Sequence, residues 1–218
     1  DGGAGVNTLV LQAAATVNLA SADQTSGDAA LVSSFQNVNA SALSTGVSIS
    51  GSASANSITG GSGADTIDGA GGADVIAAGG GDDTAIYRGA ESSIDGGAGS
   101  DTLVLTVSGG ATAVNFSVAA GADQTAGDSV AVANFENLDA SALSSALTVT
   151  GSSGANAIVA GSGADTIDGM GGADAIAAGG GDDSVAYRGA ETSIDGGAGV
   201  NTLVMKTAAT VNLASADQ

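Results

Sequence analysis

The chain has 218 residues and is strongly acidic, with three Lys and Arg against 23 Asp and Glu and a formal net charge of −20. Nucleic acids and anionic membranes reward basic surfaces, so this charge argues against both as partners, whereas it suits cations. The chain has no Cys and no His, which excludes disulfides, thiol chemistry, the usual zinc ligands and the commonest general base.

A long internal repeat organises the chain. The sequence DGGAG occurs three times, beginning at Asp1, Asp95 and Asp195. Residues 25–94 align without gaps to 125–194 with 44 of 70 positions identical, and 195–218 match 1–24 at 21 of 24 positions. We therefore expect a first repeat unit, a second unit and the start of a third, which span 1–94, 95–194 and 195–218.

The first part of each unit is less regular than the rest. In the first unit we expect short strands of wide coils at 8–12, 15–20, 30–38 and 46–50, and no substantial helix anywhere in the chain. Abundant Gly and high charge would also suit a disordered chain. The regular spacing of aliphatic and acidic residues in the second part of each unit argues against disorder. No run of 18 apolar residues occurs, so we expect no insertion into a membrane.

From Gly51 the chain reads in blocks of nine residues: GSASANSIT, GGSGADTID, GAGGADVIA, AGGGDDTAI, YRGAESSID and GGAGSDTLV. The same frame returns from Gly151 to Val204. The eighth position of a block is a branched aliphatic residue in eleven of the twelve blocks, with Ala85 as the exception. A three-residue strand that points its central side chain inward explains this column, because side chains alternate along a strand.

This pattern resembles the RTX nonapeptide G-G-x-G-x-D-x-U-x of hemolysin-type calcium-binding proteins. GGSGADTID at 60–68 and GGAGSDTLV at 96–104 match it at every fixed position. The resemblance implies an all-β fold, a right-handed parallel β-roll (a β-solenoid) that is continuous through both units. It also implies export by a type I secretion system.

Two blocks make one coil, so residues 18 apart stack along the same edge of the solenoid. The sixth position of a block then forms ladders of carboxylates at strand spacing, which repel each other unless a cation lies between them. Calcium fits, because it takes six to eight oxygen ligands and accepts backbone carbonyls. The expected Ca2+ ligands are Asn56, Asp65, Asp74, Asp83, Asp101, Asn156, Asp165, Asp174, Asp183 and Asn201.

Three departures from the motif predict weaker calcium binding. Ser92 and Thr192 stand where the motif has Asp, so the edge that contains them is expected to bind poorly at that point. Asn201 stands in place of the carboxylate found at Asp101, which should weaken one site of the second unit.

The sequence predicts a structural role rather than an enzyme. Every Asp of the blocks recurs with the repeat, whereas an active site has no reason to recur. We expect a secreted, extracellular, calcium-stiffened array on a bacterial cell surface, of the adhesin, surface-layer or matrix-filament type, that stacks head to tail with further units. Two alternatives stay open: a secretion and folding module of a toxin or hydrolase, and a module that binds ice or a glycan.

Overall fold

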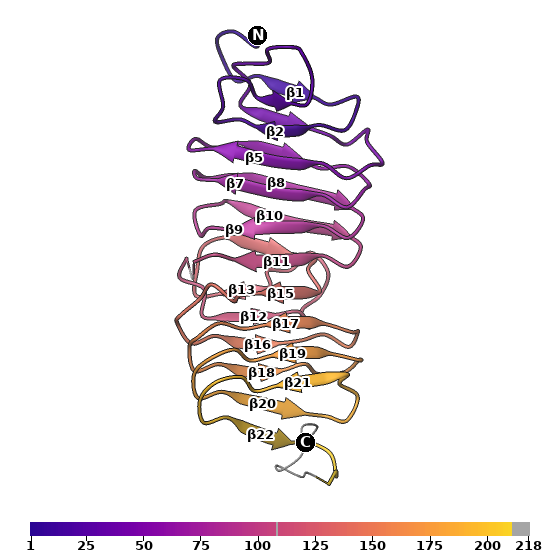
Figure 1. Ribbon diagram of the computed structural model, residues 1–218, viewed down its shortest axis with the longest axis vertical. Helices are drawn as coiled ribbons and strands as arrows, with labels where there is room; N and C mark the ends of the chain where they lie inside the picture. Colours follow the sequence, from indigo (N-terminus) through magenta and orange to yellow (C-terminus); the bar gives the residue numbers. More distant parts are fainter. Residues whose placement is uncertain (108, 211–218) are drawn as a thin grey trace.

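The computed structural model describes residues 1–107 and 109–210. Within these residues the chain is all β, and no helix is long and apolar enough to cross a membrane. Its short strands stack along one axis, with the N-terminal part at one end and the C-terminal part at the other (Figure 1). The expected parallel β-solenoid is therefore confirmed.

The strands form three sheets. The first sheet has the order β1 (Thr8–Val10), β4 (Asn37–Asn39), β6 (Ser57–Thr59), β8 (Val75–Gly80), β10 (Ser93–Ala98) and β14 (Ala131–Ala133). The second sheet has the order β3 (Thr25–Ser26), β2 (Thr16–Asn18), β5 (Ser48–Ser52), β7 (Thr66–Ala70), β9 (Thr84–Tyr87), β11 (Thr102–Leu105), β15 (Asn137–Asp139), β17 (Ala157–Val159), β19 (Ala175–Ala177) and β21 (Ser193–Asp195). The third sheet has the order β13 (Thr125–Ala126), β12 (Ala113–Asn115), β16 (Thr148–Thr150), β18 (Thr166–Asp168), β20 (Ser184–Tyr187) and β22 (Thr202–Met205).

Residues 18 apart lie next to each other within the nonapeptide blocks, as the spacing predicted. Ile67 pairs with Ala85 in the second sheet, and Ile58 pairs with Ile76 in the first sheet. These side chains point inward and are buried, with an exposed fraction of at most 1% for each. Because most side chains between the two faces are aliphatic, with Tyr87, Phe116 and Phe135 as the buried aromatic ones, the core is thin and continuous along the axis.

The irregular segments depart from the expectation in two ways. The strand expected at 30–38 is wrong for most of its length, because only Asn37 and Val38 belong to a strand, β4. The counterpart of residues 31–33 in the second unit is a strand, β14, which pairs with β10 of the first unit. Within residues 1–107 and 109–210, no strand is formed by residues 31–33. The solenoid also contains two antiparallel pairs, β2 with β3 and β12 with β13.

Successive repeats exchange faces. The strand β4 lies in the first sheet, whereas its counterpart β15 lies in the second sheet and stacks on β11. The strand β5 lies in the second sheet, whereas its counterpart β16 lies in the third. One repeat unit contributes the strands from β2 to β11. Each of these strands, except the antiparallel β3, belongs to one half of a coil, and their number is odd. The next repeat is therefore turned by about half a turn around the axis.

Candidate calcium-binding ladders

The aspartates of the sixth block position stand one above another on the turns of neighbouring coils. Hydrogen bonds connect each of them to the next coil: the Asp65 backbone N–H donates to Asp83 Oδ1 at 2.7 Å, and the Asp83 N–H donates to Asp101 Oδ1 at 2.8 Å. The second unit repeats this arrangement, since the Asp165 N–H donates to Asp183 Oδ1 at 2.8 Å. The predicted ladders with an interval of 18 residues are thus present.

The opposite edge of the solenoid carries a shorter ladder. The Asn56 backbone N–H donates to Asp74 Oδ1 at 2.7 Å, and in the second unit the Asn156 N–H donates to Asp174 Oδ1 at 2.9 Å. Ser92 follows Asp74 on this edge but supplies no carboxylate. Its N–H instead donates to the Asp74 backbone carbonyl at 2.8 Å. This shorter ladder therefore has one carboxylate per unit.

The second carboxylate oxygen is what makes these ladders suited to a cation. In six of the aspartates the Oδ2 atom is buried and has no hydrogen-bond partner, and these residues are Asp74, Asp83, Asp101, Asp165, Asp174 and Asp183. A buried, unpartnered carboxylate oxygen costs free energy, and a bound cation removes that cost. Calcium accepts such oxygens together with backbone carbonyls. The residues present therefore fit Ca2+.

Glycine at the turn lets each carboxylate lie against the backbone. A Cβ atom added at Gly69 would overlap the Asp74 carboxylate, and one added at Gly169 would overlap the Asp174 carboxylate. Within residues 1–107 and 109–210 no three acidic side chains converge on one point. An ion in a ladder would therefore need backbone carbonyls of these turns as further ligands, as calcium allows.

Burial also changes the acidity of the ladder. The pKa values of Asp74, Asp83 and Asp101 are raised to about 6, mainly because burial disfavours the charged form. Neighbouring carboxylates add to this effect: Asp101 and Asp65 raise the pKa of Asp83. The pKa values of Asp165 and Asp174 are raised as well, again mainly by burial. The metal-free ladder thus favours uptake of a positive charge, either a proton or a metal ion.

Three predicted ligands are amides that already have partners. The Asn56 side chain accepts a hydrogen bond from the Ser52 N–H at 2.7 Å and donates one to the Gln36 carbonyl. Asn156 makes the equivalent contacts with Ser152 and Glu136. Asn201 Oδ1 accepts from the Asp183 N–H at 2.9 Å. Only the side-chain oxygen of such a residue is available to a cation.

The ladder has one further member, Glu136, which the block pattern of the sequence did not predict. The Asp101 backbone N–H donates to Glu136 Oε2 at 2.9 Å, so Glu136 extends the ladder of Asp65, Asp83 and Asp101 across the junction between units. Glu136 also raises the pKa of Asp101. It lies outside the nonapeptide frame, in a Phe-Glu-Asn-Leu run, so the block period contains no signal for it.

The two arginines are not part of these ladders. Arg88 forms a bidentate ion pair with Asp68, at 2.6 and 2.8 Å, and Arg188 pairs in the same way with Asp168, at 2.8 and 2.7 Å. Both arginines thus pair locally with the excess acidic residues.

Comparison with known proteins agrees with this geometry. The family model of the RTX calcium-binding nonapeptide repeat (4 copies) matches residues 50–85, 92–105 and 150–185. These segments hold most of the ladder aspartates. A comparison with curated proteins gave no match. The repeat match and the parallel β-solenoid together fit an RTX repeat protein, whose nonapeptide repeats form a structural calcium-binding module.

Proposed function

We propose that the chain is a structural segment of an extracellular bacterial protein of the adhesin, surface-layer or filament type, and that calcium folds and stiffens it. We also propose that it is not itself an enzyme. The observation that carries this proposal is the set of buried, unpartnered Oδ2 atoms, of which those of Asp74 and Asp83 recur in the second unit at Asp174 and Asp183. Calcium is abundant outside cells, and extracellular calcium modules bind in the range of about 10⁻⁴ to 10⁻³ M.

The ligands that we propose for Ca2+ are the ten residues of the two ladder edges, with the aspartates as the main contributors. Bound calcium neutralises carboxylates that are otherwise held close together and ties each coil to the next. The repeating elements of the array are the units 1–94, 95–194 and 195–218. Because each coil contacts mainly its sequence neighbours, stiffness increases with every ion along the axis.

A second candidate is a folding module for a type I-secreted toxin or hydrolase whose catalytic domain lies elsewhere. It would use the same calcium chemistry. The long repeat favours the structural role, because unit-scale repetition extends the solenoid without creating a new kind of site.

The experiment that tests this function is a calcium titration of the metal-free chain, followed by far-ultraviolet circular dichroism. We expect a largely unfolded chain without calcium and a strand-rich spectrum at submillimolar to millimolar calcium, because the coupling of metal binding to folding supplies the missing stability. Magnesium is the control cation, since it prefers near-ideal octahedral sites and retains water. A strand-rich spectrum that persists in excess chelator would contradict the proposal.

A further inference from the structure

The first nonapeptide run, residues 51–104, meets the irregular segment that follows it at a pair of carboxylates. Asp101 belongs to the last block of the run, and Glu136 belongs to the irregular segment. We propose that these two side chains, together with the Asn134 backbone carbonyl, hold a calcium ion that fastens the irregular segment to the run. This inference rests on the proposed calcium-folded array and assigns to it a site that the nonapeptide pattern does not contain.

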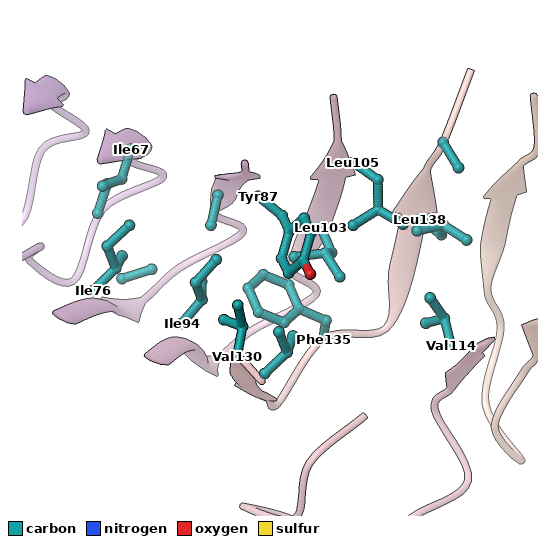
Figure 2. Close-up of a cluster of buried hydrophobic side chains, with 14 of the residues drawn as sticks. Ile67, Ile76, Tyr87, Ile94, Leu103, Leu105, Val114, Val130, Phe135 and Leu138 are labelled. Atoms are coloured by element: carbon teal, nitrogen blue, oxygen red, sulfur yellow. The ribbon is translucent and has the colours of Figure 1, made fainter. Parts of the chain in front are cut away.

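An aromatic side chain fixes the segment that carries Glu136. Phe135 lies between β14 and β15 in the chain and packs beside Ile94 and Leu103 in the core (Figure 2). Its exposed fraction is only 1%. The next residue is then held against the ladder by two hydrogen bonds: Glu136 Oε2 accepts the Asp101 N–H at 2.9 Å, and the Glu136 N–H donates to the Asp101 carbonyl at 3.2 Å. Glu136 is therefore positioned by the core rather than by a block of nine.

Asp101 directs an unsatisfied oxygen toward this segment. Its side chain is fully buried, its Oδ1 accepts the Asp83 N–H at 2.8 Å, and its Oδ2 has no hydrogen-bond partner among the described residues. A Cβ atom added at Gly96 would lie 3.0 Å from Asp101 Oδ2 and would overlap the Asn134 carbonyl oxygen. The two oxygens thus border the same small space, which glycine at position 96 keeps open.

Asparagine at the same block position has a group that Asp101 lacks. Asn201 is the counterpart of Asp101, and its Oδ1 likewise accepts an N–H from the neighbouring coil. Its Nδ2 takes the place of the aspartate Oδ2 and donates to the backbone carbonyls of Gly196 and Gly197. An ionised carboxylate cannot donate a hydrogen bond. At Asp101 a cation is therefore needed to bind the carbonyl oxygens that an amide nitrogen binds at Asn201.

The block Gly2–Val10 forms the same kind of junction without charge. Asn7 Nδ2 donates to the backbone carbonyls of Gly3 and Ser34, both at 3.2 Å. The Asn7 N–H donates to Gln36 Oε1 at 2.8 Å, which repeats the contact of the carboxylate pair. Ser34 and Gln36 are the counterparts of residues 134 and 136. A pair of neutral amides thus completes this junction by hydrogen bonds alone, whereas the pair of carboxylates lacks the donor.

The groups at the carboxylate junction suit calcium. Asp101 supplies Oδ2, Asn134 supplies a carbonyl oxygen, and Glu136 uses Oε2 for the hydrogen bond to the backbone, which leaves Oε1 for the ion. Calcium takes six to eight oxygen ligands and accepts water among them. The pKa of Asp101 is raised to about 6, first by burial and then by Glu136, Asp82 and Asp95, so negative charge is concentrated here. An ion bound to these groups connects two segments that are 35 residues apart in the chain.

Substitution of Glu136 tests the site without changing a nonapeptide residue. Glu136→Gln should keep the fold, because Gln36 makes the equivalent hydrogen bond. In millimolar calcium it should bind one calcium ion fewer per chain, measured by equilibrium dialysis. Hydrogen exchange of residues 131–139 should become about tenfold faster or more, whereas that of residues 66–87 should not change. Asp139→Asn removes a charge from the same segment and is the control, with an unchanged number of bound ions.

The reciprocal substitution should create a site. Asn7→Asp/Gln36→Glu gives the neutral junction the carboxylate pair and should bind one calcium ion more per chain. Gln36→Glu alone is the matched control, since Asn7 Nδ2 still fills the place of the ion, and it should bind no additional calcium.

Two results would overturn the junction site. One is a full number of bound ions in Glu136→Gln, and the other is an equal gain in Gln36→Glu and in the double variant. Either result, in a chain that still folds on addition of calcium, would leave the proposed function intact. A failure of the unchanged chain to fold in calcium would instead contradict the proposed function.

Discussion

Six of the ladder aspartates use their two oxygens differently, whereas both oxygens of Asp65 accept backbone hydrogen bonds. Asp83 Oδ1 accepts the N–H of Asp65 from the neighbouring coil, while Asp83 Oδ2 is buried without a partner. The first oxygen is structural and stays satisfied without metal. Burial of the second oxygen costs free energy until a cation binds to it. The calcium dependence of folding therefore originates in one oxygen atom of each such residue.

The unequal edges predict unequal effects of removing a carboxylate. Asp83 has a carboxylate on the coil before it and on the coil after it, whereas Asp74 lies between Asn56 and Ser92. Asp83→Ala should therefore raise the calcium midpoint of folding severalfold more than Asp74→Ala. Titration by circular dichroism measures both midpoints. Asp28→Ala, in an exposed turn, is the control, and equal midpoints for the two ladder variants would count against ladders with an interval of 18 residues.

Turn glycines differ in how closely the next coil approaches them. Gly79 has φ +113° and its missing Cβ would overlap the Gly61 carbonyl oxygen, whereas Gly121 has φ +75° and nothing within 4 Å. Gly121→Ala should cost about 1–2 kcal/mol through backbone strain alone. Gly79→Ala should cost more than about 3 kcal/mol, because the coils must also separate. Denaturant unfolding in saturating calcium compares the two, and similar losses would show that the close approach is unimportant.

At the scale of the element, each strand of the array stabilises its neighbours but is not stable by itself. A typical strand has three residues and one inward side chain, such as Ile58 in β6 or Ile167 in β18. Two hydrogen-bonded ladders run beside these strands at the turns. Without metal, neighbouring coils bring buried carboxylates close together. The free energy of folding therefore depends on how many of these carboxylates are protonated.

The raised pKa values of the ladder aspartates predict how the calcium-free chain responds to pH. The folded pKa of Asp74, Asp83 and Asp101 is about 6, above the ordinary value of 3.8 that applies to the unfolded chain. Between these values the folded state binds more protons, so its free energy of unfolding should rise as pH falls from 6 toward 4 and should be lowest above pH 6. Circular dichroism of the calcium-free chain at pH 7.5 and about pH 5 measures the change.

Asp83→Asn is the control for this pH effect. An amide cannot titrate, so the variant should lose part of the gain between pH 7.5 and about pH 5. Calcium should bind more weakly at the lower pH, because protons compete for the same oxygens. A calcium-free chain that is better folded at pH 7.5 than at pH 5 would contradict the raised pKa values.

At the scale of the whole molecule, the half-turn between repeats sets the pattern of the surface. Each repeat period contains an odd number of half-coils, so a feature of one unit faces the opposite direction in the next. The ion pairs Arg88–Asp68 and Arg188–Asp168 illustrate this, because they belong to the second and third sheets respectively. Faces of the same kind therefore recur only after two units.

This geometry predicts the axial repeat of an assembled fibre. In calcium, filaments of this protein should repeat along their axis after two units, with a half-turn screw relation between single units. Averaged electron micrographs of the assembled material measure the repeat. A discrete globular particle would favour the secretion-module alternative, and a repeat of a single unit without the screw relation would contradict the exchange of faces.

The sequence by itself determined the features that depend on local geometry. A period of nine residues with one inward aliphatic residue predicts a three-residue strand and a turn, and two such blocks return the chain to the same edge. The ladders of Asp65, Asp83 and Asp101 follow from this period alone, as the hydrogen bonds between them confirm. Such features need only neighbours 18 residues apart.

Only the tertiary structure decided how one unit meets the next. Leu103 pairs with Leu138 across 35 residues that have no block period, and this pairing turns the second unit, buries Phe135 and brings Glu136 onto the ladder. At this junction residues 131–133 form the strand β14 and pair with β10. A strand forms only where a partner edge is available, and the availability of that edge depends on the whole stack rather than on the local sequence.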